Sequence, residues 1–244
     1  MKIDACVFAG NSLYSNSVSP EEILRQMDRN GVDKAIIRPN KPEDYCYRRA
    51  NELTAELQLR YPRLIGFGRI NPLEKSACDQ LFDIRNMGLY GVHIHPWEDN
   101  FAVNSPRFRD FFSAAGELKL PIYVSAGYPR VSEPLQMYEC AKVNPEVTFI
   151  ATHGAQLDMS GMSFDDATLA ARARNLYFDL SGIYRRDFIE NLIAAAGSEH
   201  IVFGSCSPYM DMHLEIERII AAQIPEEQKQ MIFGQNILKL IMED

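Results

Sequence analysis

The chain has 244 residues, 46% of them hydrophobic and 24% charged, and is therefore long enough to bury the core of a single α/β domain. Its formal net charge of −8 argues against a nucleic-acid-binding surface, because binding to a polyanion requires a basic face that releases counterions. A small-molecule partner is favoured instead.

The sequence shows no targeting signal and no disulfide pattern. No cationic leader, cleavage-site pattern or apolar run of about twenty residues is found, so we expect a cytoplasmic protein that neither enters nor crosses a membrane. The five cysteines are odd in number, irregularly spaced and without a Cys-x-x-Cys pair, which predicts free thiols rather than a disulfide framework or a zinc ribbon.

Short apolar runs bounded by turn residues recur along the chain, which is typical of parallel strands joined by crossover helices. Eight strands are predicted, at 2–7, 34–38, 64–70, 91–95, 121–125, 148–152, 176–180 and 201–205.

The segments between these runs have apolar residues at helical spacing, as in Leu24 and Met27 before the stop signal Asn30-Gly31. Helices are predicted at 20–30, 42–61, 74–87, 105–118, 133–143, 165–174, 185–196, 212–223 and 226–242. Eight strand–helix units in this length predict one compact (β/α)₈ TIM barrel that takes in residues 1–244 as a single domain.

In such a barrel the functional residues lie at the carboxyl ends of the strands and on the loops that follow. The side chains at these ends that could bind or react are Cys6, Arg38, Arg69, Asn71, His93, His95, Ser125, His153, Asp179, Ser181 and Cys206.

Several strand ends carry motifs that together resemble one family. The motifs are Ile3-Asp4-Ala5-Cys6-Val7-Phe8, Gly66 to Pro72, Gly91-Val92-His93-Ile94-His95-Pro96, Ala151-Thr152-His153-Gly154, Leu176 to Ser181, Gly204-Ser205-Cys206-Ser207-Pro208 and Gly234 to Leu240. In this order they resemble the amidohydrolase-related family, the family of aminocarboxymuconate semialdehyde decarboxylase, whose members are metal-dependent barrels of the hydrolase type. The resemblance covers nearly the whole chain and implies the same fold.

The resemblance also implies which metal ligands are missing. In the family the first strand ends in a metal-binding His-x-His pair, where this chain has Cys6 and Phe8. The fifth strand's His is matched by Ser125, and the Asp of the eighth strand by Cys206. Only His153 keeps its family counterpart, a His that acts as an acid, a base or a polarising group. We therefore expect the usual metal, and any other cofactor, to be absent.

Three interpretations of the two strand-end cysteines stay open. Cys6, Cys206 and His153, with His95 as a further candidate, are ligand types that could rebuild a zinc site on neighbouring strands. The two cysteines could instead form a disulfide or a reactive thiol pair, with one of them acting as a nucleophile beside His153. The simplest alternative is that both are small buried hydrophobic residues.

The remaining polar residues suggest an anionic ligand. Arg38, Arg69, His93, His95 and His153 are predicted to converge on the mouth of the barrel although the protein is acidic, and arginine is well suited to a bidentate grip on a carboxylate. In the alternative, Arg38 and Arg69 pair with Asp4, Glu98 or Asp179 inside the barrel and bind nothing.

His93 and His95 are two residues apart on one predicted strand and so point to the same side, toward the barrel interior. We expect one of them to be a hydrogen-bonded core residue, and His95, nearer the strand end, to be the functional one. Trp97, Tyr128 and Tyr209 could form aromatic walls around a ring or an unsaturated acid.

Three functions are consistent with these features. The first is metal-independent hydrolysis or decarboxylation of a small carboxylate-bearing compound. His153, His95 and Cys206 would be catalytic, and Arg38, Arg69, His93, Ser125, Tyr128 and Trp97 would bind substrate. The second is a catalytically degenerate barrel that binds a small ligand or has a regulatory role, and the third is a hydrolase with a rebuilt Cys/His zinc site. A homodimer formed through the helices is a further possibility.

Overall fold

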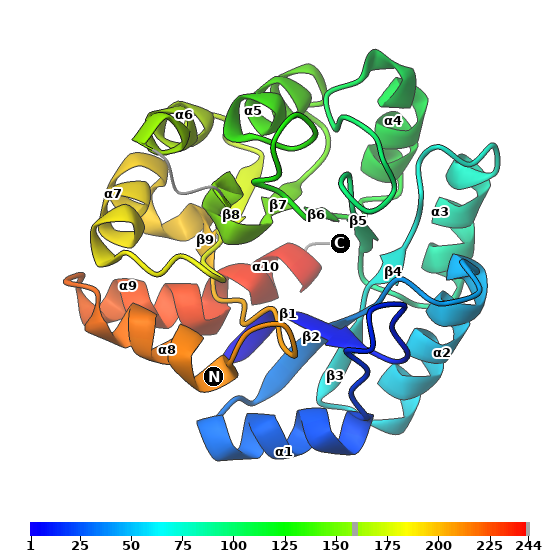
Figure 1. The fold of residues 1–244 in the computed structure, drawn as a ribbon, viewed down its shortest axis with the longest axis horizontal. Coiled ribbons are helices and arrows are strands. Elements are labelled where there is room, and N and C mark those ends of the chain that lie inside the picture. The colour runs from blue at the N-terminus through cyan, green and yellow to red at the C-terminus, as the bar shows by residue number, and fades with distance from the viewer. Residues whose placement is uncertain (158–160, 243–244) are drawn as a thin grey trace.

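The protein is described by a computed structural model that covers residues 1–157 and 161–242. Parallel strands form a ring that is surrounded by helices (Figure 1). The strands are β1 Ile3–Ala9, β2 Lys34–Pro39, β3 Leu64–Gly66, β4 Gly68–Arg69, β5 Val92–Ile94, β6 Ile122–Val124, β7 Phe149–Ala151, β8 Leu176–Asp179 and β9 Ile201–Val202. Each predicted strand is found, and the third is divided into β3 and β4 at Phe67.

The strands pair in chain order, β1-β2-β3 in one sheet and β4 to β9 in the other. Phe67 joins the two sheets, because its amide donates to Ile37 O at 2.9 Å while the next amide, that of Gly68, donates to Gly91 O at 2.9 Å. At the other junction the amides of Ala5 and Phe8 on β1 donate to Phe203 O and Ser207 O, at 2.8 and 2.7 Å. The first and last strands are therefore neighbours, as in a TIM barrel.

The helices follow the strands as predicted and differ mainly at their ends. They are α1 Pro20–Asn30, α2 Tyr47–Arg60, α3 Ala77–Asn86, α4 Arg109–Glu117, α5 Pro134–Val143, α6 Gly161–Ala170, α7 Arg186–Ala196, α8 Met212–Ala221, α9 Glu226–Gln230 and α10 Asn236–Met242, with short 3₁₀ turns at Pro106–Phe108, Thr152–Ala155 and Ser198–His200. The bounds predicted for α1 are correct because both ends are capped, by the Ser19 hydroxyl that accepts the Glu22 amide and by Gly31 in the left-handed conformation.

Other helix bounds were wrong for local reasons. The helix predicted at 42–61 begins only at Tyr47, since Tyr45 has a φ of 56° and the Asp44 carboxylate accepts the Cys46 amide in a turn. The helix predicted at 165–174 spans Gly161–Ala170, and the chain then tightens into short turns that lead to β8. The last helix is interrupted by a π-helical turn at Met231–Gln235, where Ile232 O accepts the Phe203 amide at 2.9 Å.

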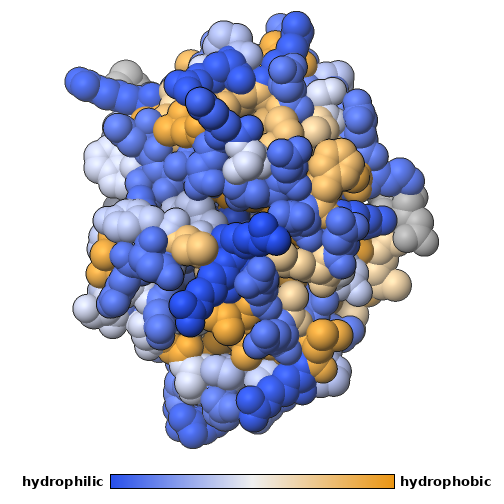
Figure 2. All heavy atoms as spheres, turned by 90° about the vertical axis from the view of Figure 1, so that its right-hand side faces the viewer, coloured by the Kyte–Doolittle hydropathy of each residue, from blue (hydrophilic) through white to orange (hydrophobic). Residues whose placement is uncertain are grey.

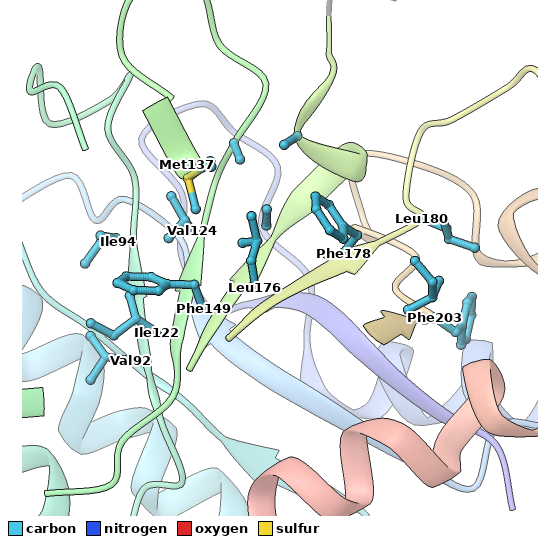
Figure 3. Packing of buried hydrophobic residues seen from close by; sticks show 14 of the residues in the cluster. Val92, Ile94, Ile122, Val124, Met137, Phe149, Leu176, Phe178, Leu180 and Phe203 are labelled. Carbon is cyan, nitrogen blue, oxygen red and sulfur yellow. The ribbon is translucent and has the colours of Figure 1, made fainter. Parts of the chain in front are cut away.

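Alternate side chains of the strands enter two different hydrophobic clusters. Those that point outward, such as Val92, Ile94 and Val124, pack against the helices, and Figure 3 shows Met137 of α5 reaching toward Val124. Full burial of each such side chain contributes about 1.5–3 kcal/mol. Those that point inward fill the barrel together with Ile237 of α10.

Helix α10 covers one end of the barrel (Figure 1). The side-chain Nδ2 of Asn236, the first residue of α10, donates to Ser198 O and Ile201 O, both at 2.7 Å, which places α10 at the amino end of β9. The carboxyl ends of the strands therefore lie at the opposite, open end of the barrel.

The outer surface shows no large apolar patch on the face that carries α3. In the coloured part of Figure 2, hydrophobic side chains on this face are scattered among hydrophilic ones. Among the described residues no helix is long and apolar enough to cross a membrane. The expected homodimer stays a prediction.

Candidate active site

The five basic residues predicted to converge do meet at the carboxyl ends of the strands. Arg38 lies near the end of β2, Arg69 at the end of β4, His93 on β5, and His95 and His153 directly after β5 and β7. Their exposed fractions range from 0% for Arg38 to 6% for His95. This set therefore lies in a low-dielectric environment in which unpaired charge is costly.

His153 is held in one orientation by the backbone. Its Nδ1 donates to the carbonyl oxygen of Ser181 at 2.8 Å, and a carbonyl oxygen can only accept, so the proton of the neutral ring lies on Nδ1. Nε2 then carries the lone pair, and no described residue bonds to it. Burial lowers the pKa of His153, with the nearby Asp179 partly opposing this effect, so the ring is neutral at neutral pH.

The guanidinium of Arg38 has unused hydrogen-bonding capacity. Its Nη2 donates to Ala5 O at 2.9 Å, whereas Nε and Nη1 are buried and have no hydrogen-bond partner among the described residues. The guanidinium carbon lies 3.7 Å from the ring centre of Tyr123 and 5.2 Å from that of Phe8. Within the described part of the chain Arg38 forms no ion pair, so the alternative in which it pairs with Asp4, Glu98 or Asp179 is wrong for this residue.

Arg69 is different, because its charge is neutralised by neighbouring carboxylates. Its Nη2 donates to Glu98 Oε2 at 2.6 Å and lies 3.4 Å from Asp99 Oδ2. Asp99 also accepts from the Tyr47 hydroxyl at 2.6 Å and from Lys41 Nζ at 3.2 Å. For Arg69, the expected alternative of an ion pair inside the barrel is therefore correct, with Glu98 as the partner.

The two histidines of the fourth predicted strand have different surroundings. His93 is fully buried, with Nε2 hydrogen-bonded to Ser125 Oγ at 2.9 Å. His95 accepts the Glu98 amide at Nδ1, and its Nε2 lies 3.6 Å from Glu98 Oε1. Burial holds the pKa of both rings well below the usual value, so both are neutral. His93 is thus a hydrogen-bonded core residue, and His95 lies nearer the mouth.

Aromatic rings lie between the surface and the buried Arg38. Tyr209, 39% exposed, contacts the ring of Phe8 at 5.1 Å between centres, and Phe8 in turn contacts His93 at 5.5 Å. On the other side Tyr128 stacks against Trp97 at 5.8 Å and tilts against His95 at 5.3 Å. The structure thus places these aromatic residues at the mouth of the barrel.

Cys6 and Cys206 are both buried, and all five cysteines are free thiols. Burial raises the pKa of Cys6 well above its ordinary value, which keeps that thiol protonated at neutral pH. Across residues 1–157 and 161–242 no three His, Cys, Asp or Glu side chains lie together so as to hold a metal ion. Cys6, Cys206 and His153 are thus not among such a group, and the rebuilt zinc site stays an alternative for experiment to test.

Several residues that shape the site were missed from the sequence. The Tyr123 hydroxyl donates to Asp179 Oδ2 at 2.5 Å, and Asp179 Oδ1 accepts the Ser181 amide at 2.5 Å. Tyr123 lies between Ile122 and Val124 on β6, so strand alternation could have placed it inside the barrel. The roles of Tyr47 and Asp99 could not be found this way, because neither lies on a strand.

A ring of parallel strands inside a ring of helices, with histidines and arginines at the carboxyl ends of the strands, defines a TIM barrel with a site in the usual position. The chain belongs to the amidohydrolase family, whose family model matches residues 11–241. The match begins just after β1, the strand that carries Cys6 and Phe8.

Solved structures with the same fold are similar over almost the whole chain. The 5-carboxyvanillate decarboxylase LigW from Sphingomonas paucimobilis has a TM-score of 0.79 and 17% identity, with 100% of this chain and 99% of that chain covered. The 2,6-dihydroxybenzoate decarboxylase from Rhizobium has a TM-score of 0.77 and 17% identity, with 98% of each chain covered. Comparison with curated protein sequences gives no match.

A dihydroxybenzoic acid decarboxylase from Polaromonas sp. JS666 was solved with bound manganese and the inhibitor 2-nitroresorcinol. It has a TM-score of 0.78 and 15% identity, with 98% of this chain and 96% of that chain covered. At such identities the likeness extends to the fold and not to the chemistry.

Proposed function

We propose that this protein is a hydrolase or decarboxylase that acts on a small carboxylate-bearing compound without the metal of its family. The observation that carries this proposal is His153, a buried neutral imidazole whose Nδ1 donates to Ser181 O and whose Nε2 is bonded to none of the described residues. Decarboxylases of aromatic acids among the similar structures support a substrate with a ring and a carboxylate.

His153 would move the proton in the reaction. In hydrolysis, Nε2 takes a proton from the attacking water, which a neutral imidazole with a free lone pair is suited to do. In decarboxylation, the protonated ring gives a proton to the carbon that loses CO₂. Because burial keeps the resting ring neutral, the base role and hydrolysis need no prior protonation.

Arg38 would hold the anion. Its Nε and Nη1 have no partner among the described residues and lie on different edges of the planar group, so each can donate one charge-assisted hydrogen bond to an anion. Arg69 is already occupied by Glu98 and Asp99, so its contribution is to position the loop after β5. His95, Ser125, Tyr128 and Trp97 would complete the walls of the site.

The side chains at the family's metal-ligand positions do not suit a divalent ion. Phe8 has no donor atom, Cys6 is kept protonated by burial, and Ser125 is hydrogen-bonded to His93. The Arg38 guanidinium lies beside Phe8 and would repel a second cation there. These features support an activity in which no step depends on a metal.

The metal content of the purified protein tests this part of the proposal. Plasma mass spectrometry is expected to find less than about 0.1 equivalent of zinc or manganese. The reason is that the side chains at these positions do not supply the donor atoms that a structural or catalytic metal site requires. Cys6→Ser and Cys206→Ser serve as controls and are expected to change nothing. Stoichiometric zinc that disappears in both variants would contradict the proposal and support the rebuilt Cys/His site.

A second candidate function is a degenerate barrel, and the packing of Phe8 favours it. Phe8 contacts Arg38, His93 and Tyr209 and covers the guanidinium from the side of the mouth. A cavity of about 420 Å³ lies between the ends of β1 and β2 and helix α2, and none of the five basic site residues lines it. In this alternative the barrel is closed and binds no ligand at Arg38.

Phe8→Ala separates the two candidates. Calorimetric titration with 2,6-dihydroxybenzoate as a probe is expected to show binding to the wild-type protein and equal or tighter binding to the variant. The variant should lose about 3–5 kcal/mol of unfolding free energy through the lost ring. Phe108→Ala, which removes a buried ring from the outer cluster, should lose similar stability and keep wild-type binding. Binding by Phe8→Ala alone would support the degenerate barrel.

A further inference from the structure

Two buried side chains are joined through a single peptide unit. The Ser181 carbonyl oxygen accepts from His153 Nδ1 at 2.8 Å, and the amide of Gly182, at the other end of the same peptide, donates to Glu215 Oε2 at 2.9 Å. A hydrogen-bonded chain thus runs from the carboxylate through the peptide to the imidazole. In such a chain each bond polarises the next.

Glu215 occupies a position where an apolar residue would be expected. Helix α8 buries Met212, Glu215, Ile216 and Ile219, a helical stripe that faces the barrel, and Glu215 is only 3% exposed. Its second oxygen accepts from Arg218 Nη1 at 2.6 Å. Burial raises the pKa of Glu215 to about 7. Burying a carboxylate costs desolvation free energy, and an apolar side chain would pack α8 against the barrel equally well.

The peptide between the two residues lies close to the imidazole. Gly182 has a φ of 72°, and a Cβ there would come within 2.7 Å of Met210 Cε and 3.1 Å of His153 Nδ1. The peptide is therefore packed against the imidazole, and the carboxylate fixes which way its carbonyl points.

We infer that Glu215 is a positioning residue for His153, which it holds in the Nδ1–H tautomer through the Ser181–Gly182 peptide. This inference rests on the proposed role of His153 as the group that moves a proton. In this tautomer the lone pair is on Nε2, the nitrogen that would act on the substrate. In other enzymes a carboxylate sets the tautomer of a catalytic histidine by bonding to it directly.

Other charged groups also act on these two residues. Asp179 and Arg38 face His153 from β8 and β2, and His95 faces it from the loop after β5. Arg218 faces Glu215 from its own helix, and Asp179 also acts on Glu215. All of these groups remain in the variants used below, so a change in the His153 signals reports on Glu215 itself.

The test is nitrogen NMR of ¹⁵N-histidine-labelled protein, with His153 assigned by the signals that disappear in His153→Asn. In the wild-type protein we expect Nδ1 to be protonated and Nε2 to have the shift of an unprotonated nitrogen. In Glu215→Ala the two shifts should move toward each other as the second tautomer is populated. In Glu215→Gln, which keeps an oxygen acceptor but loses the charge, the tautomer should persist while the pKa of His153 falls.

Glu217→Gln is the matched control, because Glu217 is an exposed carboxylate on the same helix, and it should leave the His153 signals unchanged. A wild-type spectrum with the proton on Nε2, or folded Glu215 variants with wild-type His153 shifts, would overturn the inference and leave Glu215 a structural residue. Since no substrate is used, a protein without turnover could still show the expected spectra, so failure of the proposed function is distinguished from failure of this inference.

Discussion

Substitution of His153 by Asn is expected to lower turnover by about 10²–10⁴-fold while the fold persists, because a general acid or base usually contributes that much. Asn is the suitable replacement, since His153 has a φ of 58° and Asn tolerates the left-handed conformation better than most residues. His153→Ala should have the same effect on turnover with a larger loss of stability. Turnover would be followed in a screen of small aromatic carboxylates and lactones.

The pH dependence provides an independent check on the same residue. Burial lowers the pKa of His153, so the neutral base is present at neutral pH and is lost only as the pH falls through that lowered value. For hydrolysis, in which His153 acts as the base, the rate should therefore be constant near neutrality and decrease on the acid side. His213→Asn, at an exposed position, is the control and should be wild-type. Full activity of His153→Asn would exclude this residue as the catalytic group.

The two fully buried arginines should respond to the same substitution in opposite ways. Arg69→Met would strand Glu98 and Asp99 without their cation and should cost about 3–5 kcal/mol of unfolding free energy. Arg38→Met removes a buried charge that has no ion-pair partner within the described residues, so stability should be unchanged or higher by about 1–2 kcal/mol. Tyr123 and Ser181 would still donate to Asp179 in that variant.

Ligand affinity should fall more in Arg38→Met than in Arg69→Met, the reverse of the order expected for stability. Arg38→Met loses two charge-assisted hydrogen bonds to the ligand, each with a net contribution of about 1.5 kcal/mol or more, so affinity for 2,6-dihydroxybenzoate should fall roughly 100-fold. Arg38→Lys should restore little of it, because one ammonium group cannot replace two donors that lie on different edges of the guanidinium plane. Calorimetric titration and urea unfolding measure the two effects. A strongly destabilised Arg38→Met with unchanged binding would show that Arg38 is a structural residue.

The order of elements was accessible from the sequence, whereas several boundaries were not. Alternation of apolar runs and amphipathic segments located every strand, and the cap signals at Ser19 and Gly31 set both ends of α1. The late start of α2 depends on the left-handed Tyr45, and the π-helical turn before α10 accepts a bond from the amide of Phe203, the residue directly after β9. Such features arise from contacts between segments and leave no local periodic pattern.

The grouping of the site residues followed from topology, because the carboxyl ends of parallel strands meet at one end of a barrel. The hydrogen-bond and ion-pair partners of these residues could not be predicted from topology. Nothing in the sequence distinguishes Arg38, with two unpartnered nitrogens, from Arg69, which is bonded to Glu98 and Asp99. Glu215 was missed for the same reason, since its partner is a backbone amide that lies 33 residues away in the chain.

The sequence by itself determined the barrel and the family, because strand periodicity and short motifs are local properties of the chain. Only the tertiary structure decided which buried charges are paired, which ring nitrogen of His153 is protonated and which side chain covers Arg38. These properties depend on distances of a few ångströms between side chains from different strands. Coulomb and hydrogen-bond energies change steeply over such distances, whereas residue order along the chain does not record them.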